Sequence, residues 1–217
     1  MLQATAEGRR IEAASFAIVD AEAGAHGLAP AEWSVARRVI HATADFDFQR
    51  ALAFSPGAVA AGAAALRAGC LVLCDVRMIL GGLNAARLAA LGCSARCLLD
   101  VEGVAEAARA AGTTRAAAAM RLAGRAGWLD GAVVAIGNAP TALAELSRLC
   151  AEEGARPALV IGVPVGFVGA AESKEAALAL PVPHVVARGR KGGSPVAVAV
   201  IHALAGLAAE EGTCAAP

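Results

Sequence analysis

The stretch Ala132-Val133-Val134-Ala135-Ile136-Gly137-Asn138-Ala139-Pro140-Thr141-Ala142-Leu143 decides the fold of this chain. It opens with a continuous apolar run of strand length, which ends at Gly137-Asn138. Pro140 follows, and proline is favoured in the first turn of a helix because the N–H that it lacks has no partner there. A run without polar alternation suits a parallel strand that is buried on both faces. The stretch therefore predicts a buried strand, a tight turn and a helix that begins near Pro140.

The same pattern recurs along the chain. Each further run is short and apolar, ends at glycine, arginine or an acid, and leads toward a helical segment. This spacing predicts an α/β fold in which one parallel, doubly wound, Rossmann-like sheet carries helices on both faces, in a single domain over 1–217. Ligands of such sheets bind at the carboxyl ends of the strands. The other strand-like runs are 70–75, 95–100, 158–162 and 184–187.

The N-terminal part of the chain gives weaker signals. Residues 1–14 look like a polar lead-in, and 15–20 could be a short strand or the start of a helix. A helix is expected from Pro30 through His41. Further helices are expected from Ser55 or Gly57 to about Arg67, over 83–91 after Gly81-Gly82, over 104–127 with a cap at Thr114, from 170, and from Ser194 to about Ala209.

Composition argues against several classes of function. Nineteen basic and nineteen acidic side chains cancel, so no overall field draws the protein to nucleic acid or to a membrane surface. No apolar run reaches the ~20 residues that span a bilayer, and no signal peptide is recognisable, so a cytoplasmic location is expected. The six cysteines include two C-x3-C pairs. Because zinc sites usually use C-x2-C, reduced buried cysteines and no metal site are expected.

Glycine-rich loops follow the strand-like runs but match no nucleotide-binding fingerprint. Gly162, Gly166 and Gly169 are spaced unlike G-x-G-x-x-G or the P-loop. The turn 192–195 follows the basic segment 188–191. It could bind an anion at a helix start, where free N–H groups point outward, or it could be a solvated basic turn. No G-x-S-x-G elbow is present, so a Ser-His-Asp triad is not supported.

The segment 37–48 (RRVIHATADFDF) concentrates charged and aromatic residues around His41. On a helix, Arg37 and Arg38 lie one turn before His41 on the same face. A neighbouring cation lowers the pKa of an imidazole, so the ring stays neutral and can accept a proton. The alternative is an exposed helix end, where the dipole favours arginine. His41 is the candidate acid–base residue, because the other histidines lie in a glycine-rich turn, an apolar strand and an apolar helix (His26, His184 and His202).

Several motifs together resemble the precorrin-8X methylmutases of cobalamin biosynthesis. They are RVIHATADFD at 38–47, GNAPTAL at 137–143, GVPVGFVGAAESK at 162–174 and GRKGGS at 189–194. The resemblance extends from about Ile11 to Leu207. It implies a single α/β domain that forms homodimers and uses no cofactor. The implied activity is that of an isomerase, which moves a methyl group from carbon eleven to carbon twelve of a corrin-type macrocycle and gives hydrogenobyrinate.

The resemblance also implies roles for individual residues. The family's catalytic histidine falls on His41, and its substrate-binding serine and arginine fall on Ser15 and Arg38. Arg115 matches another arginine of the family's pocket. Further substrate-binding residues are expected in the basic parts of the loop motifs, at Lys174, Arg190 and Lys191. Two positions depart from the family pattern: His202, where asparagine is frequent, and Ala42, where threonine is common.

The implied chemistry suits these residues. The substrate carries many carboxylates around a flat, apolar ring, which local Arg and Lys clusters and aliphatic side chains can bind. Methyl migration needs a macrocycle in a reactive shape and a proton that redistributes its charge, so one histidine suffices. A second subunit is expected to cover the side of the ring that the loops leave open. Two alternatives stay open: a non-catalytic tetrapyrrole- or anion-binding module, and a mutase of the cobalt complex, cobalt-precorrin-8.

Overall fold

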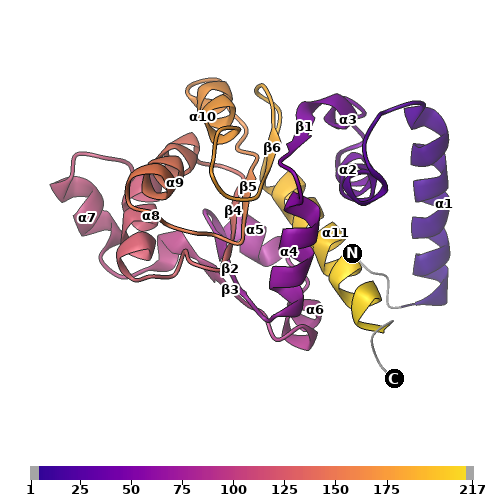
Figure 1. Ribbon diagram of the computed structural model, residues 1–217, viewed down its shortest axis with the longest axis horizontal. Coiled ribbons are helices and arrows are strands. Elements are labelled where there is room, and N and C mark those ends of the chain that lie inside the picture. Colours follow the sequence, from indigo (N-terminus) through magenta and orange to yellow (C-terminus); the bar gives the residue numbers. More distant parts are fainter. Residues whose placement is uncertain (1–4, 214–217) are drawn as a thin grey trace.

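The computed structural model describes residues 5–213, in which a six-stranded sheet lies between two layers of helices (Figure 1). The strand order is β1-β6-β5-β4-β2-β3. All neighbouring strands are parallel except β1, which pairs antiparallel with β6. The predicted α/β sheet is therefore confirmed, with one antiparallel edge strand that was not predicted. The strands are β1 (Leu52–Phe54), β2 (Leu71–Cys74), β3 (Ser94–Cys97), β4 (Val133–Ile136), β5 (Leu159–Gly162) and β6 (His184–Ala187).

The central strands are buried on both faces, as their continuous apolar runs indicate. Every residue of β4 is buried, with Val133 and Ala135 in one hydrophobic cluster and Val134 and Ile136 in the other. This alternation follows from the two-residue period of a strand. The two clusters are the cores on either side of the sheet, so each face needs a covering layer of helices.

The helices divide between the two faces of the sheet, and Figure 1 shows the sheet from its edge, with helices on either side. On one face α11 packs against α2 and α4, and on the other α8 and α10 pack against α9. The first layer contains α2 (Pro30–Thr43), α4 (Ala58–Arg67), α5 (Arg77–Gly82), α6 (Ala85–Ala90) and α11 (Ser194–Thr213). The second contains α7 (Val104–Ala110), α8 (Arg115–Arg125), α9 (Pro140–Glu152) and α10 (Ala170–Ala177). The remaining elements are α1 (Ala6–Ala23), α3 (Phe48–Ala51) and the 3-10 helix η1 (Leu98–Asp100).

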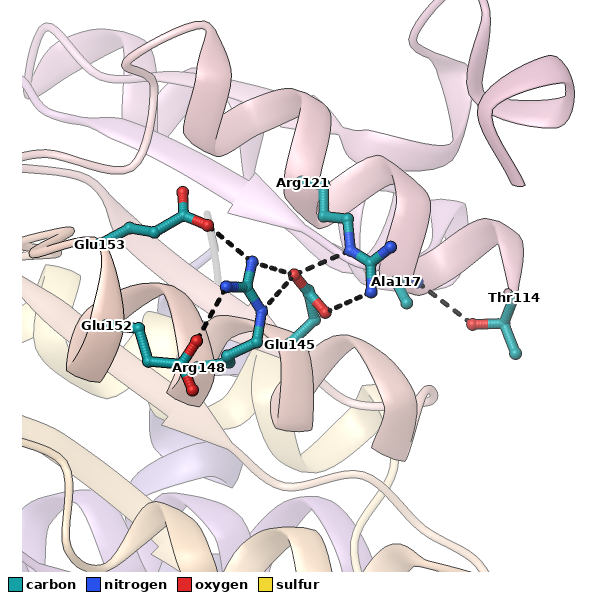
Figure 2. A network of polar contacts seen from close by, with 7 residues as sticks. All are labelled: Thr114, Ala117, Arg121, Glu145, Arg148, Glu152 and Glu153. Carbon is teal, nitrogen blue, oxygen red and sulfur yellow. Dashed lines mark hydrogen bonds and ion pairs between the residues drawn. The ribbon is translucent and has the colours of Figure 1, made fainter. Parts of the chain in front are cut away.

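An ion-pair network joins α8 to α9 (Figure 2). Glu145 on α9 is buried, and its carboxylate accepts hydrogen bonds from Arg121 on α8 and from Arg148 one turn away. Arg148 also pairs with two exposed carboxylates, Glu152 and Glu153. Burial by itself would raise the pKa of Glu145, but the hydrogen bonds from both arginines outweigh it and lower that pKa. The network therefore favours an ionised Glu145 between the two helices.

The local structure differs from the sequence-based expectations in several segments. The expected lead-in is helical from Ala6 onward, and the helix alternative for 15–20 is correct, because both belong to α1, which Thr5 caps by accepting a hydrogen bond from the Gly8 N–H. Residues 1–4 of the expected lead-in lie outside the described residues. The helix expected over 83–91 is present as the shorter α6, which Asn84 caps, and Gly81-Gly82 before it end a further helix, α5, that was not expected. Short α3 and β1 lie before Ser55, where no element was expected. None of the helices within residues 5–213 is long and apolar enough to cross a membrane.

Candidate active site

His41 lies on the last turn of α2 and is exposed to solvent. Its ring packs edge-on against Phe16 of α1, with ring centroids 5.1 Å apart and planes inclined by 61°. Partial burial, followed by the positive charge of Arg38, lowers the pKa of His41 below its usual value near 6.5. The imidazole is therefore neutral near pH 7, with one nitrogen able to donate a hydrogen bond and the other able to accept one.

A pocket of about 380 Å³ lies beside His41, between α1 and the end of α2. Ser15 lines the same pocket, so the structure brings together the two residues that the resemblance assigned to catalysis and binding. Ala44 ends α2 in a left-handed conformation (φ 53°), which turns the chain away just after the histidine. The rest of the lining is mostly apolar and comprises Ile18, Val19, Glu22, Ile40, Ala44 and Phe46.

Arg38 lines a second pocket of about 270 Å³, between α1, α2 and α11. Its guanidinium lies 2.7 Å from the carboxylate of Glu12, and both side chains are largely buried. It also lies 4.8 Å from the ring centroid of Phe16, a distance typical of a cation–π contact. Phe16 therefore contacts both the Arg38 guanidinium and the His41 imidazole.

His202 of α11 lines this second pocket and is half-buried. Its Nε2 accepts a hydrogen bond from the backbone N–H of Asn84 at 3.1 Å. Burial lowers the pKa of His202 to about 4, and the charges of Arg38 and Arg87 act in the same direction. The departure from the family pattern at this position therefore lies in a pocket wall, close to the predicted arginine.

Lys191, which follows β6, contacts the segment that follows His41. Its ammonium donates hydrogen bonds to the carboxylates of Asp45, at 2.7 Å, and Asp47. The predicted substrate-binding lysine is thus already paired with two carboxylates within the chain. The contact brings the start of α11 and the end of α2 to the same part of the molecule.

Three loops meet at the carboxyl edge of the sheet and are hydrogen-bonded to one another. The N–H of Gly193 donates to the carbonyl of Val163 at 2.8 Å, and the N–H of Gly166 donates to the carbonyl of Arg190 at 3.2 Å. A Cβ atom at Gly192 would lie only 2.2 Å from the Val163 oxygen, so this approach requires glycine. The loops are 137–139 after β4, 163–169 after β5 and 188–193 after β6.

Asp75 supports the first of these loops from below. It is 2% exposed, and its carboxylate accepts hydrogen bonds from the backbone N–H groups of Gly137, Asn138 and Ala139 at 3.1, 2.9 and 2.7 Å. Burial raises the pKa of Asp75, while the three backbone hydrogen bonds oppose that shift. The sequence signal was an acid directly after an apolar strand, but no role had been assigned to it.

Lys174 lies beneath the loop after β6. The residue is fully buried, and its ammonium donates to the backbone carbonyl of Lys191 at 2.8 Å. Burial lowers the pKa of Lys174 to about 8. A direct substrate contact was expected at this lysine, whereas in the structure its charged end supports the loop that carries Arg190 and Lys191.

Arg115 and Arg190 have no carboxylate partner among the described residues. Arg190 lies 5.6 Å from the ring centroid of Phe167, whereas its neighbour Arg188 pairs with Glu175. Arg115 begins α8 and lines a separate pocket of about 420 Å³, so the structure does not place it beside His41. That pocket also contains Val76, Arg77, Met78, Leu99, Asp100 and Asn138.

Among the side chains that the structure describes, residues 5–210, no group of three or more His, Cys, Asp or Glu residues is arranged to hold a metal ion. The cysteines of that range are free thiols. Burial raises the pKa of Cys70 and of Cys74 to about 12, so both stay protonated.

Known proteins similar to this chain all point to one family. The family model described as "CbiC: Precorrin-8X methylmutase" matches residues 10–207. A cobalt-precorrin-8 methylmutase of Leptospira interrogans is 47% identical over 98% of this chain and 99% of its own length. A precorrin-8X methylmutase of Pseudomonas aeruginosa is 45% identical over 94% of this chain and 98% of its own length. The solved structure of a precorrin-8X methylmutase from Thermus thermophilus has a TM-score of 0.89 and 53% identity, and the match covers 94% of this chain and 98% of that one.

The chain belongs to the precorrin-8X methylmutase family. It is therefore an isomerase of cobalamin biosynthesis that catalyses intramolecular methyl migration. The alternative of a non-catalytic tetrapyrrole-binding module is not favoured.

The candidate site contains side chains for which the sequence predicted no role. Glu12 and Phe16 surround Arg38 and His41, yet they lie where the sequence suggested a lead-in and an unassigned segment. No local pattern could have found them, because they meet α2 only through tertiary packing. Asp45 and Asp47 stood in the recognised motif, but no pattern linked them to Lys191.

Proposed function

We propose that His41 is the general acid–base residue of this methylmutase. The observation that carries the proposal is an exposed, neutral imidazole in one pocket with Ser15. A neutral imidazole both donates and accepts a proton, so it can exchange one with the conjugated ring system of the substrate. That exchange redistributes charge while the methyl group moves from carbon eleven to carbon twelve. A contribution of ~10²–10⁴-fold to the rate is typical of such a group.

Substrate binding is proposed to be electrostatic at the rim of the macrocycle. The part of the macrocycle nearest His41 is proposed to bind Arg38 and Ser15. Carboxylates farther along the carboxyl edge of the sheet are proposed to bind Arg115, Arg190 and Lys191. In support, Arg115 and Arg190 have no carboxylate partner among the described residues. A guanidinium binds a carboxylate through two parallel hydrogen bonds, which gives orientation as well as affinity.

The proposed substrate is metal-free precorrin-8X, and the proposed product is hydrogenobyrinate. The second candidate is the cobalt complex, because the Leptospira interrogans relative is named for cobalt-precorrin-8 at 47% identity, while the Pseudomonas aeruginosa relative is named for precorrin-8X at 45%. Identity at these levels does not separate the two substrates. Both substrates are therefore needed to distinguish the two candidates.

The protein is further proposed to act as a homodimer. The exposed side of α1 carries two large apolar side chains, Ile11 and Ile18, which are 55% and 58% exposed and lie two helical turns apart. This apolar side borders the pocket of Ser15 and His41, to which Ile18 itself contributes. A two-fold partner, the commonest oligomeric arrangement, could cover it and complete the pocket. Light scattering at micromolar concentration measures the oligomeric state, and full activity of a dilute monomer contradicts a shared site.

The experiment is to incubate the purified protein with precorrin-8X and, separately, with cobalt-precorrin-8 while ultraviolet–visible spectra are recorded. Permanent conversion of the absorption bands supports a mutase, and the faster conversion identifies the substrate. The variant His41→Ala should bind product but not convert substrate. His26→Ala is the control, because His26 stacks on Trp33 outside the pocket and should not matter. Turnover by His41→Ala at the parent rate would refute the assignment.

A further inference from the structure

The loop after β5 presents apolar side chains to solvent. Phe167 is 82% exposed, Val168 is 90% exposed and Val165 is 48% exposed. Single exposed apolar residues are ordinary, but three of them within four positions form a local patch. Their exposure contributes nothing to the stability of the isolated chain, because apolar side chains stabilise a fold only when they leave water. The patch lies at the carboxyl edge of the sheet, where ligands of parallel sheets bind.

The loop that carries this patch is fixed by hydrogen bonds to the loop after β6. The N–H of Gly166, directly before Phe167, donates to the carbonyl of Arg190. The carbonyl of Val163 accepts from Gly193. The buried ammonium of Lys174 in turn donates to the carbonyl of Lys191. A patch on a supported backbone loses little conformational freedom when a ligand binds.

A cation without a carboxylate partner lies beside the patch. The guanidinium of Arg190 is 5.6 Å from the ring centroid of Phe167, and no carboxylate among the described side chains, residues 5–210, pairs with it. The neighbouring cations differ in this respect: Arg188 pairs with Glu175, and Lys191 pairs with Asp45 and Asp47. An exposed aromatic ring next to an unpaired guanidinium suits a ligand that is flat and apolar with an anionic rim.

We infer that Phe167 and Val168 contact one apolar face of the tetrapyrrole ring and that Arg190 binds a carboxylate on its rim. The inference rests on the proposed function for the identity of the ligand. Position supports it as well, because Lys191 of the adjoining loop contacts Asp45, which follows His41. The ring would extend from His41 along the carboxyl edge of the sheet, over the loop after β5. A purely apolar partner would leave the Arg190 charge without a counterpart.

The first test is a titration of hydrogenobyrinate against the full-length protein, followed by absorbance. Phe167→Ser should weaken binding about tenfold to a hundredfold, because burying a phenylalanine side chain is worth about 1.5–3 kcal/mol. Phe167→Leu keeps an apolar surface and should stay within a few fold of the parent. Because the ring face is held in substrate and transition state alike, KM should rise in Phe167→Ser while kcat changes little.

The second test removes the charge. Arg190→Ala should weaken product binding about tenfold and reduce its dependence on salt, since one charged hydrogen-bonded contact is lost. Arg125→Ala is the matched control. Arg125 is also exposed and has no carboxylate partner in the part of the chain that the structure describes, but it lies at the end of α8 that leads into the start of β4. Equal effects of the two substitutions would overturn the role of Arg190.

The remaining outcomes are separated by light scattering and by turnover of the parent protein. If Phe167→Ser binds product as the parent does, the inference is wrong. If it loses affinity only because its oligomeric state changes, the patch is a subunit contact and the inference is also wrong. If the parent binds product but converts neither substrate, the proposed function fails, while weaker binding by Phe167→Ser still supports the inference. A parent that neither binds nor converts contradicts both.

Discussion

The Nζ atom of Lys191 lies 2.7 Å from the carboxylate of Asp45, although 146 residues separate them in the chain. Asp45 follows the end of α2 and Lys191 precedes the start of α11. The ion pair therefore connects the segment after His41 to the loop that carries Arg190. We therefore expect a change at this contact to affect His41 and Arg190 together.

Replacing Lys191 by methionine should lower both product affinity and turnover. The substitution removes the tie between the two segments, so the histidine and the rim no longer hold one relative position. The melting temperature should change little, because the Lys191 side chain is 49% exposed and exposed ion pairs contribute little to stability. Lys191→Arg keeps the charge and should retain most of the activity.

The control for Lys191 is Arg109→Met, which breaks an exposed pair with Glu106 on α7, far from the site along the chain. Steady-state kinetics and product titration measure both variants. If Lys191→Met and Arg109→Met have the same product affinity and turnover, the contact between Lys191 and Asp45 has no role in function.

Replacing Arg38 by lysine should weaken product binding by about tenfold or more. The Arg38 guanidinium contacts Glu12 and Phe16 at the same time, and a lysine ammonium cannot reproduce that planar, two-sided contact. Binding by the parent should weaken as salt rises, and to a similar extent in Arg38→Lys, because lysine keeps the positive charge. Titration of product at low and high ionic strength measures both effects. An unchanged product affinity in Arg38→Lys argues against a bidentate contact between Arg38 and a carboxylate of the ligand.

Replacing Glu145 by glutamine should destabilise the fold by about 1–2 kcal/mol at pH 7, since charged hydrogen bonds from two arginines are lost. The folded-state pKa of Glu145 is lowered, so its contribution is present above the unfolded-state pKa and disappears as the pH falls through the folded value. The two proteins should therefore converge in acid. Urea denaturation at several pH values tests this, with exposed Glu152→Gln as a control that should have little effect.

The sheet was predictable because each inner strand corresponds to a recognisable local pattern in the sequence. Val133–Ile136 and Leu159–Gly162 are continuous apolar runs that end at glycine or at a turn. The edge strand β1 has only three residues, and its pairing with β6 is non-local, so no short-range signal marks it. The helix α1 buries only Val19. Because so little of it faces the core, its sequence lacks the apolar period that identifies a packed helix.

The site was predictable where its residues are neighbours in sequence. Arg38 and His41 share one helix face, so one motif contains both. Contacts made through tertiary packing were not predictable, and the pair of Lys191 with Asp45 is an example. Burial was equally hidden: Lys174 looks like an available cation in the sequence, but packing covers it completely.

The pKa of His41 should depend on two neighbouring charges in opposite directions. Burial contributes most to the lowered pKa of His41, the positive charge of Arg38 lowers it further, and the negative charge of Glu12 raises it. Arg38→Gln should therefore move the pKa of His41 up toward 6.5, and Glu12→Gln should move it further down. An NMR titration of the imidazole in the free protein measures both shifts without relying on substrate binding.

Activity should follow the same titration. If the neutral imidazole of the free enzyme is the active form, kcat/KM should fall as the pH drops, with a midpoint below 6.5 that matches the NMR value. The midpoint should move to lower pH in Glu12→Gln, because the imidazole then stays neutral in more acidic solution. His26→Ala should leave the profile unchanged, since that ring stacks on Trp33. A midpoint that does not follow the measured pKa of His41 across these variants would mean that another group supplies the proton.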